Sequence, residues 1–564
     1  MRPRRAFAVA AALAIGALAW ILLRPVPRVV YLGGPILSVD ETDRVVGALG
    51  VEGDRIAAVG EREEVLVWGG SGARIVNLAG RALLPGFIDA HGHFPGAGIP
   101  AIYEDLNSPP IGDLRSIDDI VLRLAARATR TDDGEWIVGW SYDDTLLSDR
   151  RHPTRGDLDR ASTRHPIVVW HISGHLCVAN SPALERLGID AGRADPEGGR
   201  IRRDARGEAD GVLEETAAEL VNASLPKPGI LDSLAILREA TRRTLSAGVT
   251  TAQNGYAEAA HLDALLWASR LGLFPLRLVV WPRAEVAEQI QRGTLAFDPP
   301  EGGRVRRGAV KLIADGSIQA YTGYLGEPYH VPPGDDPGYR GYPRIARDEL
   351  IRQVGRFHRA GWQVAVHGNG DAAIDDILDA FEAAQRDDPR GDPRHVVVHA
   401  QMARDDQLDR MHALGVIPSF FVLHTFYWGD RHREIFLGPE RAARISPTHS
   451  ADLRGLRFTL HADSPVVPME PLRIVWAAVN RRTTGGREIG PEERISPQRA
   501  LRAVTIDAAR QHFQEASLGS LEPGKLADLV ILSRSPLEDP AHIDQIRVLE
   551  TIIGGRSEWR AQSP

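Results

Sequence analysis

Cysteine and lysine are both scarce in this chain of 564 residues, and long apolar runs are confined to its N-terminus. The single cysteine, Cys177, cannot form an intramolecular disulfide, so it is expected to be a small buried residue. Basic clusters are missing beyond the N-terminus and the net charge is -8, which argues against nucleic-acid binding. The 43% hydrophobic and 25% charged residues indicate a globular protein with an ample core.

Lysine occurs only at Lys227, Lys311 and Lys525, although the chain has 67 Lys plus Arg residues. Lys311 lies in the apolar, strand-like run 308–316, where burial disfavours its charged form. A desolvated lysine, unlike arginine, can lose its proton and add carbon dioxide to become a carbamate that bridges two metal ions. Taken alone, Lys311 favours the simpler interpretation, an amphipathic strand whose lysine reaches back to solvent.

The segment 83–93 ends in the sequence His91-Gly92-His93. Because side chains alternate faces along a strand, both imidazoles are predicted to share one face with Asp89. Imidazole is a common ligand of zinc and similar metals, and the small Gly92 would let the backbone approach a metal. The segment therefore predicts metal ligands at a strand end.

Three more polar residues, His367, His399 and Asp463, each end an apolar segment. The first two are 32 residues apart, the length of one strand and helix, and the last two are 64 apart, the length of two such units. Further strands are predicted at residues 249–253, 276–281 and 415–422. The fold class predicted from this rhythm is α/β, a (β/α)8 TIM-like barrel, in which residues far apart in sequence meet at the C-terminal ends of the strands.

Short motifs recur along almost the whole chain after its N-terminal segment. They are Pro85–His93, Ser173–His175, Asn180–Leu184, Ala247–Thr251, Val310–Ser317, His367–Asp371, His399–Gln401, Ala462–Pro465 and Gly519–Val530. Together they resemble the amidohydrolase superfamily, and within it the amidohydrolase 3 family that includes N-substituted formamide deformylase-like proteins.

The resemblance implies two divalent metal ions, expected to be Zn²⁺. His91 and His93 would hold one ion, His367 and His399 would hold the other, and carboxylated Lys311 would bridge them. Such a metal pair lowers the pKa of a shared water, so that a bridging hydroxide attacks the substrate carbonyl. Asp463 would take the hydroxide proton and deliver it to the leaving nitrogen, as general base and then general acid.

The function implied by the resemblance is hydrolysis of the C–N bond of a small amide, formamide or cyclic amide. One alternative is a deaminase with a single metal, although such sites need no barrel lysine. Another is a catalytically silent, membrane-tethered binding barrel, which would be expected to have lost ligands, whereas all six are present here. A homo-oligomer is compatible with all three.

Two positions depart from the family pattern. Val397 stands where relatives often place a glutamate, which affects a contact beside the site and not a ligand. His461 stands where a glycine is common, two residues before Asp463. It could narrow the site, add a proton donor, or be a packed histidine.

Residues 83–513 are expected to form the barrel, with roughly 150 residues, 94–246, as a folded insertion over the site. Residues 28–82 alternate apolar and polar side chains, and by family likeness would join 514–564 in a small β-sandwich. The insertion and loops would select the substrate.

The strand-like segment 168–175 within the insertion is predicted to place His171, Ser173 and His175 on one face. By resemblance, His175 would bind the substrate carbonyl or its oxyanion. Tyr324, which follows the Lys311 strand, is a weaker candidate for substrate binding.

Residues 1–27 are predicted to be a membrane anchor or an export signal. Arg2, Arg4 and Arg5 precede Ala6–Leu23, a run of 18 residues without a charge. Ala17–Ala19 resembles a cleavage site, but cutting there would leave an apolar terminus exposed, which favours an uncleaved anchor. Positive charges before the segment would keep the N-terminus in the cytoplasm and place the enzyme on the periplasmic or extracellular side.

Overall fold

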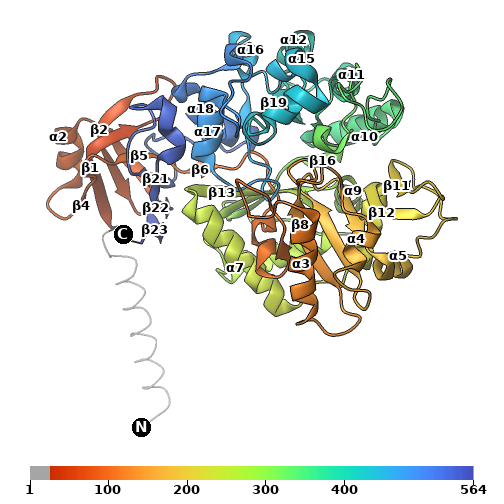
Figure 1. Ribbon diagram of the computed structural model, residues 1–564. Helices are drawn as coiled ribbons and strands as arrows, with labels where there is room; N and C mark the ends of the chain where they lie inside the picture. The colour runs from red at the N-terminus through yellow and green to blue at the C-terminus, as the bar shows by residue number, and fades with distance from the viewer. Residues whose placement is uncertain (1–25, 563–564) are drawn as a thin grey trace, which may run out of the picture.

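The computed structural model describes residues 26–562, and two parallel sheets form its centre (Figure 1). One sheet has the order β15-β14-β13-β6 and the other β16-β17-β18-β19-β20. Their strands are β6 (Phe87–Ile88), β13 (Val249–Ala257), β14 (Arg277–Pro282), β15 (Val305–Arg307), β16 (Val310–Ile313), β17 (Val364–Gly368), β18 (Val396–His399), β19 (Ile417–Phe420) and β20 (Thr459–Leu460). Each predicted barrel segment contributes a strand to this arrangement, an α/β fold of the amidohydrolase barrel type.

Backbone contacts join the two parallel sheets at both of their edges. At one edge, Arg283 forms a parallel bridge to Lys311. At the other, the amide of His93 donates to the carbonyl of Ser464 at 2.7 Å, and that of Asp463 donates to His91 at 3.2 Å. Four candidate ligands therefore lie where the two sheets meet.

The segment 83–88, which the sequence presents as one apolar strand, is divided between two sheets. β5 (Ala82–Pro85) pairs with β21 (Leu529–Leu532), whereas β6 pairs with β13. Gly86 lies between the two strands. The residue there must be glycine, because a Cβ would lie 2.3 Å from the Thr250 side chain. The first barrel strand therefore begins at Phe87.

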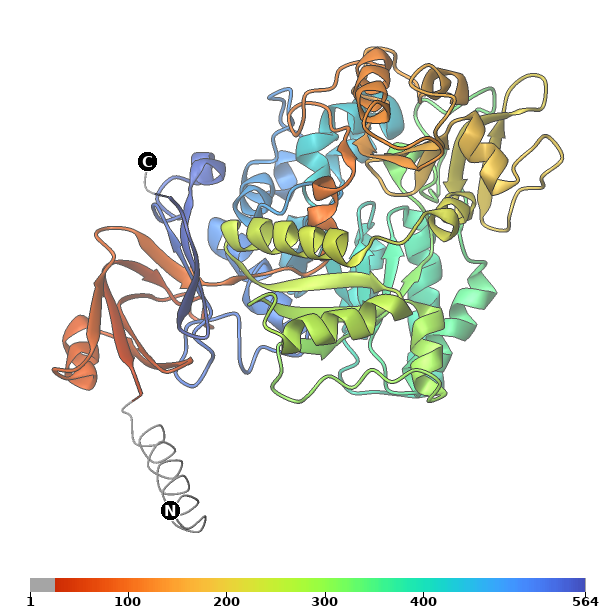
Figure 2. The same cartoon turned by 90° about the horizontal axis from the view of Figure 1, so that it is seen from below.

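Both chain ends build one sheet of eight strands beside the barrel, as the red and dark-blue strands show in both views (Figures 1 and 2). Apolar side chains that include Tyr31, Leu49, Leu529 and Ile552 pack together between its halves. The predicted joining of the two ends is confirmed, as a single sheet that forks at β1. Its other strands are β1 (Arg28–Leu37), β2 (Val45–Glu52), β3 (Arg55–Gly60), β4 (Arg74–Asn77), β22 (Val548–Ile553) and β23 (Arg556–Arg560).

A fourth sheet, of six strands, lies between β6 and β13 in the sequence, with the order β11-β12-β10-β9-β8-β7. Its strands are β7 (Glu104–Asp105), β8 (Ile137–Tyr142), β9 (Ile167–His171), β10 (Leu176–Ala179), β11 (Gly199–Arg203) and β12 (Ala209–Glu215). The prediction of one strand over 168–175 was wrong: β9 ends at His171, and the chain turns through Gly174, with φ 73°, into antiparallel β10. Cys177 is fully buried in β10, as predicted.

Amphipathic helices cover the barrel, and α11 shows why they form. It buries Ile374, Ile377, Leu378 and Phe381, a spacing that places them on one helical face. The α-helices of the whole described chain, including those of the insertion and of the sheet formed by the chain ends, are α2 (Arg62–Gly69), α3 (Ile117–Ala128), α4 (Arg155–Asp159), α5 (Ser181–Leu187), α6 (Thr216–Ser224), α7 (Ile230–Ser246), α8 (Ala259–Arg270), α9 (Ala284–Gln291), α10 (Arg347–Arg359), α11 (Asp371–Asp387), α12 (Asp405–Leu414), α13 (His424–Tyr427), α14 (Gly429–Arg431), α15 (Gly438–Ala443), α16 (Thr448–Leu453), α17 (Pro471–Asn480), α18 (Pro497–Ala503) and α19 (Ile506–Gln511).

The predicted N-terminal anchor falls almost wholly on residues 1–25, which lie outside the described range. Among residues 26–562, no helix combines the length and the apolar character needed to cross a membrane.

Candidate metal centre

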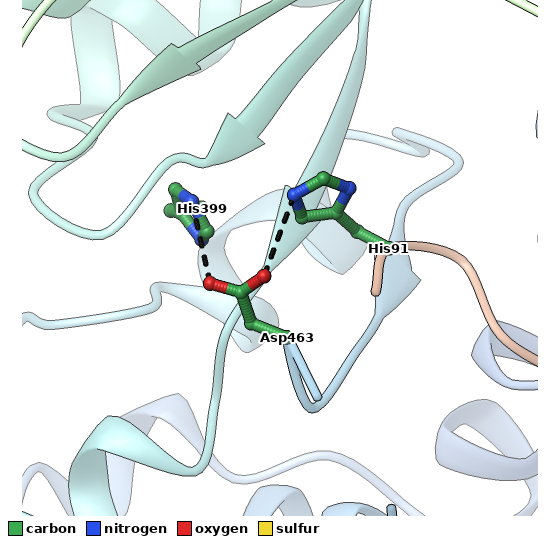
Figure 3. Close-up of side chains that lie close together, drawn as sticks. All are labelled: His91, His399 and Asp463. Carbon is green, nitrogen blue, oxygen red and sulfur yellow. Dashed lines mark ion pairs between the residues drawn. The ribbon is translucent and has the colours of Figure 1, made fainter. Parts of the chain in front are cut away.

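The Asp463 carboxylate, just beyond β20, lies between imidazoles from other parts of the barrel (Figure 3). Its Oδ1 is 3.1 Å from His93 Nε2 and 3.5 Å from His91 Nε2. Its Oδ2 is 4.0 Å from Nε2 of His399, the last residue of β18. The predicted ligands at the first, sixth and eighth strands are thus adjacent.

The remaining two predicted ligands extend the same cluster. His367, near the end of β17, points its Nδ1 at Nε2 of His399, with 3.1 Å between the two nitrogens. Lys311 in β16 places Nζ 3.0 Å from His91 Nε2. All six side chains that the sequence nominates as metal ligands are therefore brought together by the fold.

A hydrogen bond behind His91 determines which of its nitrogens faces the cluster. His91 Nδ1 is 2.8 Å from Gln253 Oε1, which only accepts, so Nδ1 carries the hydrogen and Nε2 holds the lone pair. His367 Nε2 lies 3.1 Å from the carbonyl oxygen of Gly316, an acceptor, and 3.0 Å from the side-chain amide nitrogen of Asn369, a donor, so both tautomers of His367 find a partner. Gln253 was not identified from the sequence, where its only signal is an amide at the end of an apolar strand.

Burial controls the charges of the cluster. It lowers the pKa of His91, His367 and His399 well below the usual value, so their imidazoles are neutral. It also lowers the pKa of Lys311 to about 8. Burial would raise the pKa of Asp463, but the nearby imidazoles of His93, His91 and His461 outweigh burial and hold that pKa well below its usual value.

Backbone strain marks two of the ligand positions. His399 and Asp463 have φ angles of 73° and 54°, in the left-handed region that costs a residue other than glycine on the order of 1–3 kcal/mol. Gly92 is needed for another reason: a Cβ there would lie 2.4 Å from Asp89 Oδ2. The close approach of a buried carboxylate is therefore a reason for glycine here, and the predicted approach of this backbone to a metal stays a prediction.

The donor set fits a divalent metal. Ligand atoms of His91, His399 and Asp463 all lie within 4.8 Å of one another. Asp463 Oδ1 is buried and has no hydrogen-bond partner among the described residues, so it holds lone pairs for a ligand. Neutral imidazole nitrogens with a carboxylate oxygen are the donors that zinc and similar metals take in proteins.

Of the two predicted substrate-binding residues, His175 lies beside the candidate ligand His367. Its ring centroid is 5.1 Å from that of His367, and its Nδ1 is 2.9 Å from Glu215 Oε2, which also lies 3.1 Å from Arg344 Nη1. Glu215 is buried at the end of β12, with φ 53°, and was missed in the sequence because nothing local marks it.

Tyr324 contacts Arg340 and Asp315. Its ring lies 5.6 Å from the Arg340 guanidinium, and its backbone N–H donates to Asp315 Oδ2 at 3.0 Å. Asp315 also accepts the backbone N–H groups of Asn369 and Gly370, so it ties this loop to the end of β17.

A second group of candidate ligand atoms within 4.8 Å of one another consists of Asp143, Asp144 and His171 in the insertion. Asp143 Oδ2 accepts the indole N–H of Trp428 at 2.9 Å, and Asp144 Oδ1 is 3.1 Å from His171 Nε2. The group therefore spans the contact between the insertion and the loop after β19.

Comparison with known proteins agrees with the fold and the site. The Amidohydrolase family model matches residues 74–557. N-substituted formamide deformylase of Arthrobacter pascens is 28% identical, over 92% of this chain and 96% of its own length. The protein LONG AFTER FAR-RED 3 of Arabidopsis thaliana is 29% identical, over 93% of this chain and 90% of its own length.

A crystal structure of an uncharacterized metal-dependent hydrolase from Pyrococcus horikoshii OT3 covers 91% of this chain and 99% of its own, with a TM-score of 0.71 and 26% identity. Fold and donor set together define a metal-dependent hydrolase. The family match is equally clear: the chain belongs to the amidohydrolase family.

Proposed function

We propose that this protein is a binuclear metal hydrolase that cleaves the C–N bond of a small amide, formamide or cyclic amide. The observation that carries the proposal is the convergence of all six predicted ligands on one face of the barrel, where Asp463 Oδ1 has no hydrogen-bond partner among the described residues. The similarity to a protein named as a formamide deformylase supports the bond type.

His91 and His93 would hold one ion, and His367 with His399 would hold the other. Lys311 would lie between them as a carbamate, which its burial and its Nζ position 3.0 Å from His91 support. When bound, two Zn²⁺ ions would polarise the substrate carbonyl and make a water molecule acidic near neutral pH.

The remaining chemistry falls to side chains of this chain. Asp463 would accept the proton of the attacking water at a carboxylate oxygen and return it to the leaving nitrogen. His175 would donate from Nε2 to the carbonyl oxygen of the substrate, since its Nδ1 is engaged by Glu215. The insertion would exclude bulk water and select the substrate.

We further propose that residues 28–82 and 514–564 form one domain and residues 83–513, with the insertion 94–246, the other. The N-terminal segment 1–27 would anchor the enzyme outside the cytoplasm, as its charge pattern supports. Nucleic acid is not an expected partner, and self-association is open to measurement by light scattering.

The test is to load the full-length chain in detergent with Zn²⁺ and assay a panel of N-formyl and N-acyl amines before and after chelation. We expect about two metals per chain and hydrolysis that chelation abolishes reversibly. Full activity with one metal or none would exclude the binuclear mechanism. Release of ammonia from amino-substituted rings, with no amide hydrolysis, would favour the deaminase alternative.

A further inference from the structure

His461, which the sequence leaves open as a packed residue or a proton donor, lies directly behind a predicted metal ligand. It follows β20, is 1% exposed, and places Nε2 3.1 Å from His399 Nδ1. Its other nitrogen, Nδ1, is 2.9 Å from Ser419 Oγ in β19. The ring also lies within 5.3 Å of the His91 ring and 5.4 Å of the Phe421 ring, so its orientation is fixed from several sides.

His399 differs from His91 in the group that lies behind it. His91 Nδ1 faces Gln253 Oε1, an oxygen that only accepts, so His91 Nε2 carries no hydrogen. Behind His399 stands a second imidazole, which can either donate or accept. The nitrogen that His399 offers to a metal is therefore set by the tautomer of His461.

Two arrangements satisfy the hydrogen bonds. In the first, Ser419 donates to His461 Nδ1, and His461 Nε2 donates to His399 Nδ1. The hydrogen of His399 is then on Nε2, directed at His367 Nδ1, which is 3.1 Å away. In the second, His399 Nδ1 donates to His461, which donates to Ser419. Only the second arrangement frees His399 Nε2, and the change between them shifts hydrogens along the chain with no net gain or loss of protons.

We propose that His461, oriented by Ser419, is a positioning residue that sets the tautomer of His399 and thereby the affinity of the second metal site. The inference rests on the proposed function, because it assumes that His399 and His367 share a metal. It assigns a role to the one histidine by which this chain departs from the family motif.

The test replaces His461 by phenylalanine, which keeps a ring but has no acceptor, and by glutamine, whose amide oxygen can accept from His399 Nδ1. Zn²⁺ binding to the full-length chain is measured by competition with a chromophoric chelator. We expect His461→Phe to weaken one of two sites by about 10- to 100-fold, the range typical of groups behind a ligand, and to leave the other within twofold. His461→Gln should restore most of that affinity, and Ser419→Ala should weaken the same site by less than His461→Phe.

A matched control is His395→Phe, which removes another buried histidine. His395 immediately precedes β18, at the end of the strand away from His399, and is hydrogen-bonded to His358 at 2.8 Å. It should lower the thermal stability of the metal-free chain without changing Zn²⁺ affinity. Unchanged affinity in His461→Phe, or equal weakening by His395→Phe, would overturn the role of His461 alone. A wild-type chain that binds no Zn²⁺ would overturn the proposed function as well.

Discussion

Among residues 26–562, two groups of carboxylate and imidazole side chains bring candidate ligand atoms within 4.8 Å of one another, one in the barrel and one in the insertion. Both groups consist of Asp and His residues, and in both the ligand atoms lie within 4.8 Å of one another. They differ in whether their polar atoms are already hydrogen-bonded within the protein.

In the insertion, the carboxylate of Asp143 accepts from Thr145 N–H at 2.9 Å and from Trp428 Nε1 at 2.9 Å, and Arg431 lies 3.5 Å away. The lone pairs of Asp143 are therefore occupied by hydrogen bonds within the protein, and the buried Arg431 guanidinium lies beside its carboxylate. In the barrel, Asp463 Oδ1 has no hydrogen-bond partner among the described residues. A metal site needs free lone pairs on its ligand atoms, in addition to ligand residues that lie close together.

The largest expected effect tests the barrel group at Lys311. Lys311→Arg should abolish metal binding and activity, because guanidinium cannot be carboxylated and adds a fixed positive charge among the ligands. Metal content and turnover measure both losses. Lys311→Ala should regain part of both in acetate, since a small carboxylate can occupy the vacant space.

The matched control is Lys525→Arg, because Lys525 pairs with Glu522 at 2.7 Å, away from the barrel face, and arginine can keep that pair. It should change neither metal content nor turnover. A Lys311→Arg enzyme with two metals and a near-normal rate would exclude the carbamate.

The next effect tests whether the unpartnered carboxylate of the barrel group does proton transfer. Asp463→Asn should lower kcat by about 10²- to 10⁴-fold, the usual contribution of a general acid or base, because an amide cannot accept the proton. Steady-state kinetics at matched metal content measures the loss. A decrease below tenfold would assign proton transfer to another group.

A smaller effect is expected at the contact between insertion and barrel made by Glu215. Glu215→Gln should lower kcat/KM by about 10- to 100-fold, because it weakens a charge-assisted hydrogen bond that orients His175. If Glu215 acts through His175, the double variant with His175→Ala should cost no more than His175→Ala alone. Additive losses would show that the two residues act independently.

The barrel and its ligands could be predicted because each ligand is a local feature. His367, His399 and Asp463 end apolar segments whose spacing matches whole strand and helix units. In a barrel, position at a strand end is enough to place a side chain on the active face. No knowledge of the partners in space was needed.

The groups that orient those ligands could not be predicted, because each comes from elsewhere in the chain. Gln253 lies 162 residues from His91, and Ser419 lies 42 residues from His461. The role of Tyr324 stays a prediction, and its described contacts are with Arg340 and Asp315. The switch of sheets at Gly86 was hidden because the segments on both sides of it are apolar.

The smallest expected effect on catalysis completes the contrast between the two groups. Asp144 is bonded to His171 at 3.1 Å and lies 3.7 Å from His152, so it serves as an internal partner for two imidazoles. Asp144→Asn should leave the metal content unchanged and turnover within about twofold. It should lower the free energy of unfolding by about 1.5–3 kcal/mol, because a hydrogen bond to a charged group is weakened.

Denaturant titration of the metal-free and Zn²⁺-loaded chains should give the same loss, since a residue that binds no metal contributes equally in both states. If the loss were larger in the loaded chain, or if one metal were missing, the insertion group would be a metal site and free lone pairs would no longer explain the difference between the two groups.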